Sequence, residues 1–155
     1  MGKPDAAAVH AFVAAARRAV LATSDEAGRP RLVPIAFVVA PEAGDMMTLY
    51  TPIDEKPKRT ADPLALARVR DLQARPSAAV LVDRWSEDWR QLGWVRLACR
   101  GSIVESTAGA EDHARAVADL RAKYPHYATH RLESRPLIRL ECAVTHTWGR
   151  IGEEA

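Results

Sequence analysis

The chain has 155 residues, of which 48% are hydrophobic and 27% are charged, and its formal net charge is +2. This length predicts a single domain over 1–155, and the small net charge argues against a nucleic-acid-binding surface. No apolar stretch approaches the roughly 20 residues that a membrane helix needs, and the N-terminus has no signal-peptide layout. We therefore expect a soluble, cytoplasmic protein with neither a membrane nor a nucleic acid as partner.

The predicted elements mix helices with strands. A helix over 4–17 is followed by strands over 19–23, 31–40 and 46–51, a helix over about 62–74, strands over 77–83 and 93–106, a helix over 110–124 and a strand over 136–144. Short turns between consecutive strands predict antiparallel pairing. Six strands with few edges predict a small barrel in an α+β domain.

Pro34 is unusual because the surrounding run LVPIAFVVA otherwise indicates a strand buried on both faces. Proline cannot donate a hydrogen bond to a sheet ladder. We expect either that the strand lies at a sheet edge at Pro34 or that something other than a strand lies beside it.

The segment LYTPIDEKPKR ends a predicted strand at Pro52 and then places Lys56, Lys58 and Arg59 within four residues. A loop stiffened by prolines and carrying three cations is suited to holding a phosphate. From the loop alone, a solvated basic segment is an equally good interpretation.

Three of the four tryptophans, Trp85, Trp89 and Trp94, fall in the segment DRWSEDWRQLGWVR. Tryptophan is enriched at interfaces, and arginines such as Arg96 stack on aromatic or anionic partners. A flat ligand or a protein interface is the favoured interpretation, and a local hydrophobic plug over one mouth of the barrel is the alternative.

Familiar catalytic and metal-binding motifs are missing from the sequence. There is no nucleophilic triad, HExxH, Walker loop or GxGxxG after a strand, so we expect no metal site and assign no catalytic nucleophile. Cys99 and Cys142 lie in apolar runs without metal-ligand spacing, and we expect them to be reduced core residues.

The patterns LATSDEAGRPRLVPIAFV, LYTPIDEKPKR and AAVLVDRWSEDWRQLGWVRLACRGS together resemble the pyridoxamine 5′-phosphate oxidase-like flavin and deazaflavin oxidoreductases. The resemblance extends from about Val20 to Cys142 and is greatest to the branch of coenzyme F420-dependent enzymes. It implies a six-stranded antiparallel split β-barrel with peripheral helices, assembled as a homodimer with cofactor sites at the subunit interface. The implied cofactor is coenzyme F420, with FMN as the alternative.

The resemblance also implies which residues bind the cofactor. Backbone of Val33, Pro34 and Ile35 would lie beside the ring, Tyr50, Thr51 and Pro52 would flank it, Lys56, Lys58 and Arg59 would hold the phosphate, and Trp85, Trp89, Trp94 and Arg96 would come from the partner subunit or close the site. The chain departs from the family pattern at Asp71, where relatives often carry asparagine, and at Gly93, where a bulky aromatic residue is expected.

The function that follows from the resemblance is hydride transfer between the reduced deazaflavin and a small conjugated acceptor. The cofactor would carry the redox chemistry, and Arg96 or Tyr50 is a candidate hydrogen-bond donor to the acceptor. The alternatives are an FMN-dependent oxidase or reductase of the same fold, and a flavin- or deazaflavin-binding protein without turnover.

Overall fold

The computed structural model describes residues 4–41, 46–53, 62–107 and 110–152. The helices are α1 (Ala6–Ala15), α2 (Ala67–Ala74) and α3 (Glu111–Lys123), with short 3-10 helices η1 (Pro63–Ala65), η2 (Trp89–Gln91), η3 (Pro125–Thr129) and η4 (Leu132–Ser134). The strands are β1 (Ala19–Ser24), β2 (Pro30–Ile35), β3 (Val38–Val39), β4 (Met46–Pro52), β5 (Ser77–Arg84), β6 (Gly93–Val104) and β7 (Leu137–Gly149). The predicted elements all occur in the predicted order, and β7 extends five residues beyond its predicted end.

Two aspartates fix where the first two helical segments begin. At the start of α1, Asp5 Oδ1 accepts a hydrogen bond from the Ala8 amide at 2.6 Å. At the start of η1, Asp62 Oδ1 accepts from the Leu64 amide at 2.9 Å, and Pro63 occupies the first position. The predicted start near Asp62 is confirmed, although extended backbone at Leu66 divides the predicted helix into η1 and α2.

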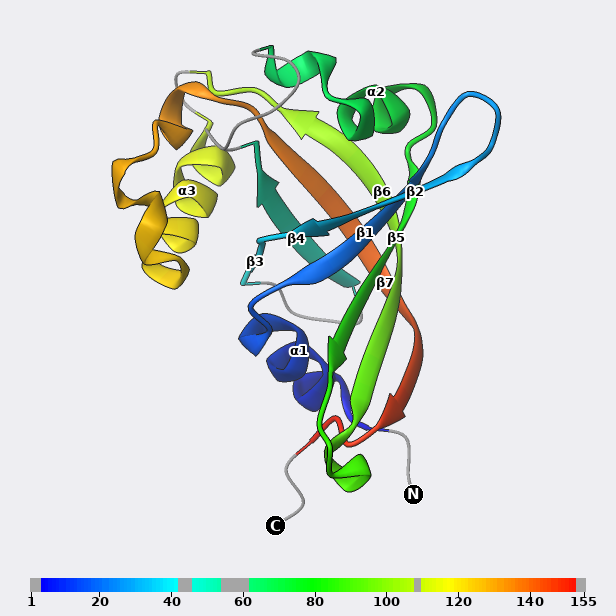
Figure 1. The fold of residues 1–155 in the computed structure, drawn as a ribbon. Helices are drawn as coiled ribbons and strands as arrows, with labels where there is room; N and C mark the ends of the chain where they lie inside the picture. The colour runs from blue at the N-terminus through cyan, green and yellow to red at the C-terminus, as the bar shows by residue number, and fades with distance from the viewer. Residues whose placement is uncertain (1–3, 42–45, 54–61, 108–109, 153–155) are drawn as a thin grey trace.

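All seven strands form one antiparallel sheet in the order β2-β1-β5-β6-β7-β4-β3. The two edge strands, β2 and β3, follow one another in the chain, so the sheet has curled until its two edges are joined by a two-residue connection (Figure 1). No strand pairing closes the sheet there. The fold is therefore the predicted α+β split barrel, with seven strands in place of six.

The seventh strand arises because the predicted strand over 31–40 is interrupted at Ala36 and Phe37. The Phe37 amide donates to the Tyr124 hydroxyl at 3.0 Å, and the Phe37 carbonyl accepts from Lys123 Nζ at 3.0 Å. These two side chains at the end of α3 provide hydrogen bonds that a neighbouring strand would otherwise provide. As a result β2 ends before Phe37 and β3 begins after it.

Pro34 lies on an edge strand, opposite Val20 of β1. The edge position predicted for it is confirmed, because β2 pairs with β1 on one side and has no strand on the other among the described residues. The expectation of burial on both faces is wrong for β2, where Arg31, Leu32 and Pro34 are exposed. Edge strands have one open side, so an apolar run in such a strand need not be buried.

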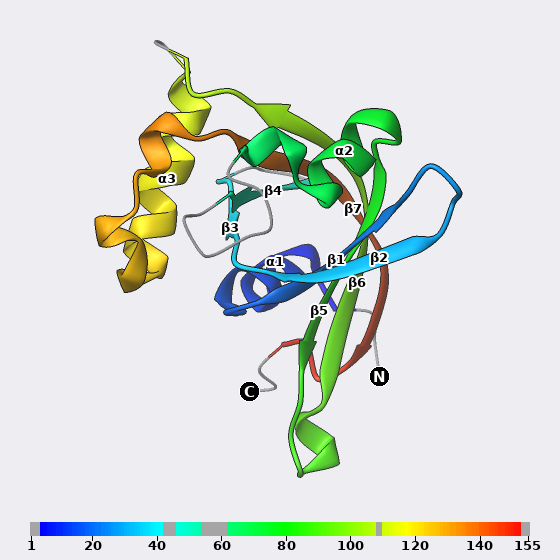
Figure 2. The same cartoon turned by 45° about the horizontal axis from the view of Figure 1, so that its top comes forward.

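Helices α1 and α2 lie on the inner side of the curled sheet, whereas α3 packs on its outer side. In Figures 1 and 2, α1 lies inside the curl, α2 caps one end, and α3 stands beside β3 and β4. One core cluster contains Val9 and Val13 of α1 and the inward residues of the sheet, and a second joins Leu120 of α3 to Tyr50 of β4. Along β6 the residues alternate between buried and exposed, so its other face points out of the barrel.

Cys99 of β6 lies directly opposite Cys142 of β7, and the two form a disulfide. The prediction of reduced cysteines is wrong in this structure, although both are in the core as expected. The two residues are 43 apart in sequence. Their pairing depends on the register of β6 and β7, which the apolar pattern of either strand alone does not specify.

Candidate functional site

A row of apolar side chains crosses the outer face of the sheet from β2 to β4. Each residue of the row is the partner of the next on the neighbouring strand, across six strands: Leu32, Ala22, Ala79, Ala98, Ala143 and Met46. The two end residues are strongly exposed, Leu32 at 66% and Met46 at 54%. With strands about 4.8 Å apart, the row extends about 25 Å. An apolar band of this length, open to solvent in the single chain, is typical of an interaction surface.

The next row on the same face ends in polar residues. Pro34, Val20, Leu81, Arg96 and His146 are consecutive partners across β2, β1, β5, β6 and β7. The Arg96 guanidinium approaches His146 Nδ1 at 3.5 Å, and the His146 ring is stacked on Trp94 with centroids 5.9 Å apart. This group places a cation and a large aromatic ring beside the apolar band.

A shallow concavity of about 530 Å³ lies where these rows meet. Its lining includes Val20, Ala22, Leu32, Ala79, Leu81, Asp83, Trp94 and Arg96. Small side chains form its floor, and the indole and guanidinium groups stand at one side. An apolar floor with the Arg96 guanidinium and the Asp83 carboxylate beside it suits a planar conjugated ring that carries polar atoms at one edge. The concavity therefore suits a ring system of the flavin type.

Trp94 and Arg96, two of the predicted cofactor-binding residues, line this concavity. Pro34 is on the same face, opposite Val20, whereas its neighbours Val33 and Ile35 point to the other side of the strand. Ile35 is 5% exposed and belongs to the core. The structure thus brings Pro34, Trp94 and Arg96 to one surface and turns the side chains of Val33 and Ile35 away from it.

The predicted residues Tyr50, Thr51 and Pro52 are buried at the end of β4. They pair with the start of β7, which in turn pairs with the end of β6. Arg96, in contrast, lies near the start of β6, about 20 Å away along the strand. Within one chain, a single ring system therefore does not reach both groups.

Trp85 and Trp89 lie on the β5–β6 connection, 71% and 77% exposed. Figure 1 places this connection at the opposite end of the sheet from α2. Neither side chain lines the concavity, and the interpretation of a plug over the barrel mouth is wrong for them because they are largely exposed. Lys56, Lys58 and Arg59 lie outside the described residues.

Sequence reasoning missed seven lining residues: Val20, Ala22, Leu32, Ala79, Val80, Leu81 and Asp83. Leu81 and Asp83 are exposed around the buried Val82 in β5, but the run AAVLV is apolar throughout, so no pattern in the sequence marked these residues. Within the described residues, no group of three or more histidine, cysteine, aspartate or glutamate side chains is placed to hold a metal ion. Nor does any described helix combine the length and apolarity that crossing a bilayer would require.

Comparison with known proteins supplies the family. The sequence model described as pyridoxamine 5′-phosphate oxidase matches residues 6–149. None of the curated proteins searched matches the chain.

Several solved structures share the fold at low sequence identity. A conserved hypothetical protein from Mycobacterium tuberculosis has a TM-score of 0.66 at 17% identity, with 94% of this chain and 83% of that chain covered. An FAD-binding protein from Mesorhizobium loti has a TM-score of 0.54 at 15% identity, covering 93% and 90%. A structure named F420 reductase has a TM-score of 0.55 at 15% identity, covering 91% and 96%.

Proposed function

This chain belongs to the pyridoxamine 5′-phosphate oxidase family, and we propose that it is an oxidoreductase that binds coenzyme F420 and reduces a small conjugated acceptor. The observation that carries the proposal is the flat apolar concavity beside Trp94 and Arg96. An F420 reductase and an FAD-binding protein share the fold, which supports a flavin-type ligand and leaves FMN as the second candidate.

The residues at the concavity fit such a ring. Ala22 and Ala79 offer no side-chain atoms beyond Cβ, so a planar group can lie close to the sheet. The indole of Trp94, half-buried and held against His146, would contact an edge of the ring. When bound, reduced F420 supplies the hydride. The protein would exclude water, orient the ring and leave one face open to the acceptor.

Arg96 is the better candidate for a donor to the acceptor. Its side chain is exposed at the concavity, and its planar guanidinium is suited to a carbonyl or carboxylate oxygen. Tyr50 is 2% exposed and packed in the second core cluster. A role for Tyr50 in the same pocket would require the residue to come from another subunit.

A homodimer would unite the two groups of predicted residues. The apolar row on the outer face is about 25 Å long, which is enough to seat an interface of the standard size, about 800 Å² per partner. In our proposal, the Trp94 and Arg96 side of one subunit meets the Tyr50 to Pro52 side of the other around the cofactor. The exposed Trp85 and Trp89 would then be covered by the partner.

The phosphate is proposed to bind Lys56 and Lys58, with support from Arg59. Charge-assisted hydrogen bonds to an anion are worth about 1.5–3 kcal/mol each. Replacing both lysines with alanine is expected to weaken cofactor binding by several kcal/mol, on the order of 3–6. An unchanged dissociation constant would place the phosphate elsewhere.

Titration of F420 and FMN under the same conditions tests the cofactor proposal. We expect the purified protein to quench F420 fluorescence at lower concentrations than it binds FMN, and Trp94→Ala to weaken F420 binding. A yellow preparation that retains FMN and ignores F420 would favour the FMN enzyme. Tight F420 binding without hydride transfer to any enone, quinone or tetrapyrrole acceptor would favour the binding protein.

Sedimentation of Ala98→Arg tests the dimer separately. A guanidinium in the middle of the apolar row should convert the dimer to monomer, because a buried unpaired charge is costly at an interface. Gln73→Arg, an equivalent change on the exposed side of α2, should leave the dimer intact. A monomeric wild-type protein would contradict the shared site.

A further inference from the structure

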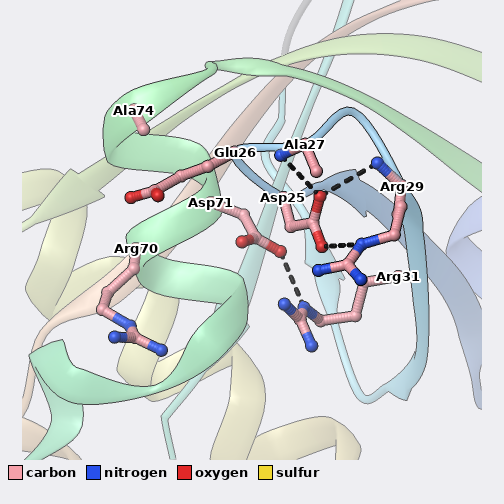
Figure 3. A pocket seen from close by; sticks show the side chains of 8 residues that line it. All are labelled: Asp25, Glu26, Ala27, Arg29, Arg31, Arg70, Asp71 and Ala74. Atoms are coloured by element: carbon pink, nitrogen blue, oxygen red, sulfur yellow. Dashed lines mark hydrogen bonds and ion pairs between the residues drawn. The ribbon is translucent and has the colours of Figure 1, made fainter.

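A second cavity, of about 350 Å³, lies between the β1–β2 hairpin and α2 (Figure 3). Residue alternation places it on the opposite side of β2 from the concavity described above, because Arg31 lines this cavity and the adjacent Leu32 lines the other. The cavity is polar, and its wall contains three arginines and three carboxylates. It is therefore a feature separate from that concavity.

Two of the three carboxylates are engaged within the wall. Asp25 Oδ1 accepts from the amides of Ala27 and Arg29 at 2.9 Å each, and its Oδ2 accepts from Arg29 Nε at 2.8 Å. These bonds, the Arg29 amide first, hold the pKa of the Asp25 carboxyl below its usual value. Asp25 therefore belongs to the hairpin turn and is not available to a ligand.

Asp71 is the second engaged carboxylate. Its side chain is 8% exposed, and its Oδ2 accepts from Thr23 Oγ1 and from Arg31 Nε, both at 2.8 Å. The bond to Asp71 uses Nε of Arg31 and leaves the two Nη groups of the guanidinium for another partner. Asp71 thus positions Arg31 and occupies one side of its fork.

Arg70 directly precedes Asp71 on α2. Within the part of the chain that the structure describes, its guanidinium has no hydrogen bond or ion pair. Figure 3 shows the guanidinium groups of Arg70 and Arg31 on either side of Asp71, from the helix and from the hairpin. Two arginines that approach one space from two elements are suited to grip the oxygens of an anion.

The walls of the cavity are held in place without a ligand. Arg75 Nη2 donates to the Glu26 carbonyl at 2.9 Å, which ties the end of α2 to the hairpin turn. Together with the Thr23–Asp71–Arg31 contacts, this gives two links between helix and hairpin. A preformed site of this kind binds an anion without first ordering its own walls.

We propose that this cavity is a binding site for a small oxyanion, a phosphate or carboxylate group held by the Nη groups of Arg31 and by Arg70. The Glu26 carboxylate, at the edge of the same cavity, opposes the anion and limits its affinity. The residues that would hold this anion are other than Lys56 and Lys58. It requires neither F420 nor FMN.

The test is calorimetric titration of the cofactor-free protein, with inorganic phosphate and with succinate as separate probes. The Lys56→Ala/Lys58→Ala protein serves as the background, so that the second phosphate position does not contribute. We expect saturable binding of at least one probe at millimolar concentration. Tighter phosphate binding would indicate a phosphate-bearing ligand, and tighter succinate binding a carboxylate-bearing one.

Arg70→Ala is expected to weaken that binding about tenfold or more, since each charge-assisted bond to an anion is worth at least a factor of this size. Glu26→Gln should strengthen it, and Arg115→Ala, which removes an arginine from the exposed side of α3, should leave it unchanged. The affinity for F420 or FMN should be the same with and without the Arg70→Ala change.

Three results would overturn the proposal. These are the absence of saturable binding of either probe, an affinity that Arg70→Ala does not change, and an equal loss in Arg115→Ala, which would indicate a non-specific effect of net charge. Arg70 is exposed on α2, so its replacement should not prevent folding, and circular dichroism of the variant checks this. Failure here would leave the cofactor proposal untouched, because that proposal is measured with F420 and FMN.

Discussion

Replacement of Asp71 by alanine should reveal how strongly α2 is tied to the β1–β2 hairpin. The Asp71 carboxylate accepts from Thr23 Oγ1 and Arg31 Nε at 2.8 Å. Thr23 is 3% exposed, so its hydroxyl would lose a partner that water cannot easily replace. The Arg31 side chain is 43% exposed, so water can take over much of what Asp71 provides there.

The expected loss follows from these two exposures. A buried hydroxyl left without a partner costs about 1–3 kcal/mol, and an ion pair with one exposed member contributes about 0.5–1 kcal/mol. Asp71→Ala should therefore lower the free energy of unfolding by about 1.5–4 kcal/mol. Urea denaturation at pH 7 measures this, with an unchanged m-value as the sign that the two-state transition is preserved.

A double-mutant cycle with Thr23→Val tests the cause. Once the hydroxyl is gone, the loss of Asp71 should cost less, so the two changes together should destabilise by about 1 kcal/mol less than their sum. Glu105→Ala removes an exposed carboxylate and should change stability by no more than about 0.5 kcal/mol. An Asp71→Ala protein as stable as wild type, or strict additivity in the cycle, would refute the reasoning.

Three further predictions concern single features of the fold. Burial lowers the pKa of Lys123 to about 8 from its usual 10.5. Between pH 8 and about 10.5 the unfolded chain therefore holds a proton that the native state has released. In urea unfolding, the free energy of unfolding should rise with pH in this range, relative to that of Lys123→Met. Gly149 has φ +76° and a Cβ there would lie 2.2 Å from the Leu92 carbonyl oxygen, so Gly149→Ala should lose about 2–4 kcal/mol in the same assay. The Cys99–Cys142 disulfide closes a loop with a sequence separation of 43, and its reduction should lower stability by up to about 4 kcal/mol, measured by unfolding with and without dithiothreitol.

Each of these has an outcome that contradicts it. If the difference in unfolding free energy between wild type and Lys123→Met does not change with pH, the hydrogen bonds from Lys123 Nζ to the carbonyls of Ala14 and Phe37 offset its burial. Gly152→Ala is the matched control for Gly149, because a Cβ at Gly152 would meet Ala8 Cβ at 3.6 Å, and equal effects at both glycines would reject the steric explanation. Alkylation of two thiols in the native, unreduced protein would show that the disulfide is not formed.

Much of the secondary structure could be predicted from local chemistry. The capping residue Asp62 with Pro63 after it, the apolar run of β5 and the turn before Pro30 all act over a few residues, so the pattern in the sequence was sufficient. The combined motifs also indicated the family, which the match over residues 6–149 confirms. The assignment of the phosphate to Lys56 and Lys58 stays a prediction.

The tertiary structure decided which side chains meet. Phe37 leaves the sheet because Tyr124 and Lys123, 87 and 86 residues later, bind its backbone. In the sequence, Asp71 is a departure from the family pattern. In the fold, its carboxylate positions Arg31, which lies on a strand 40 residues earlier. Such contacts depend on strand register and helix placement, which are set by the packing of the whole core rather than by neighbouring residues. For that reason the sequence by itself determined the elements and the family, whereas the open apolar face and the arginine-lined cavity emerged only when the strands were placed side by side.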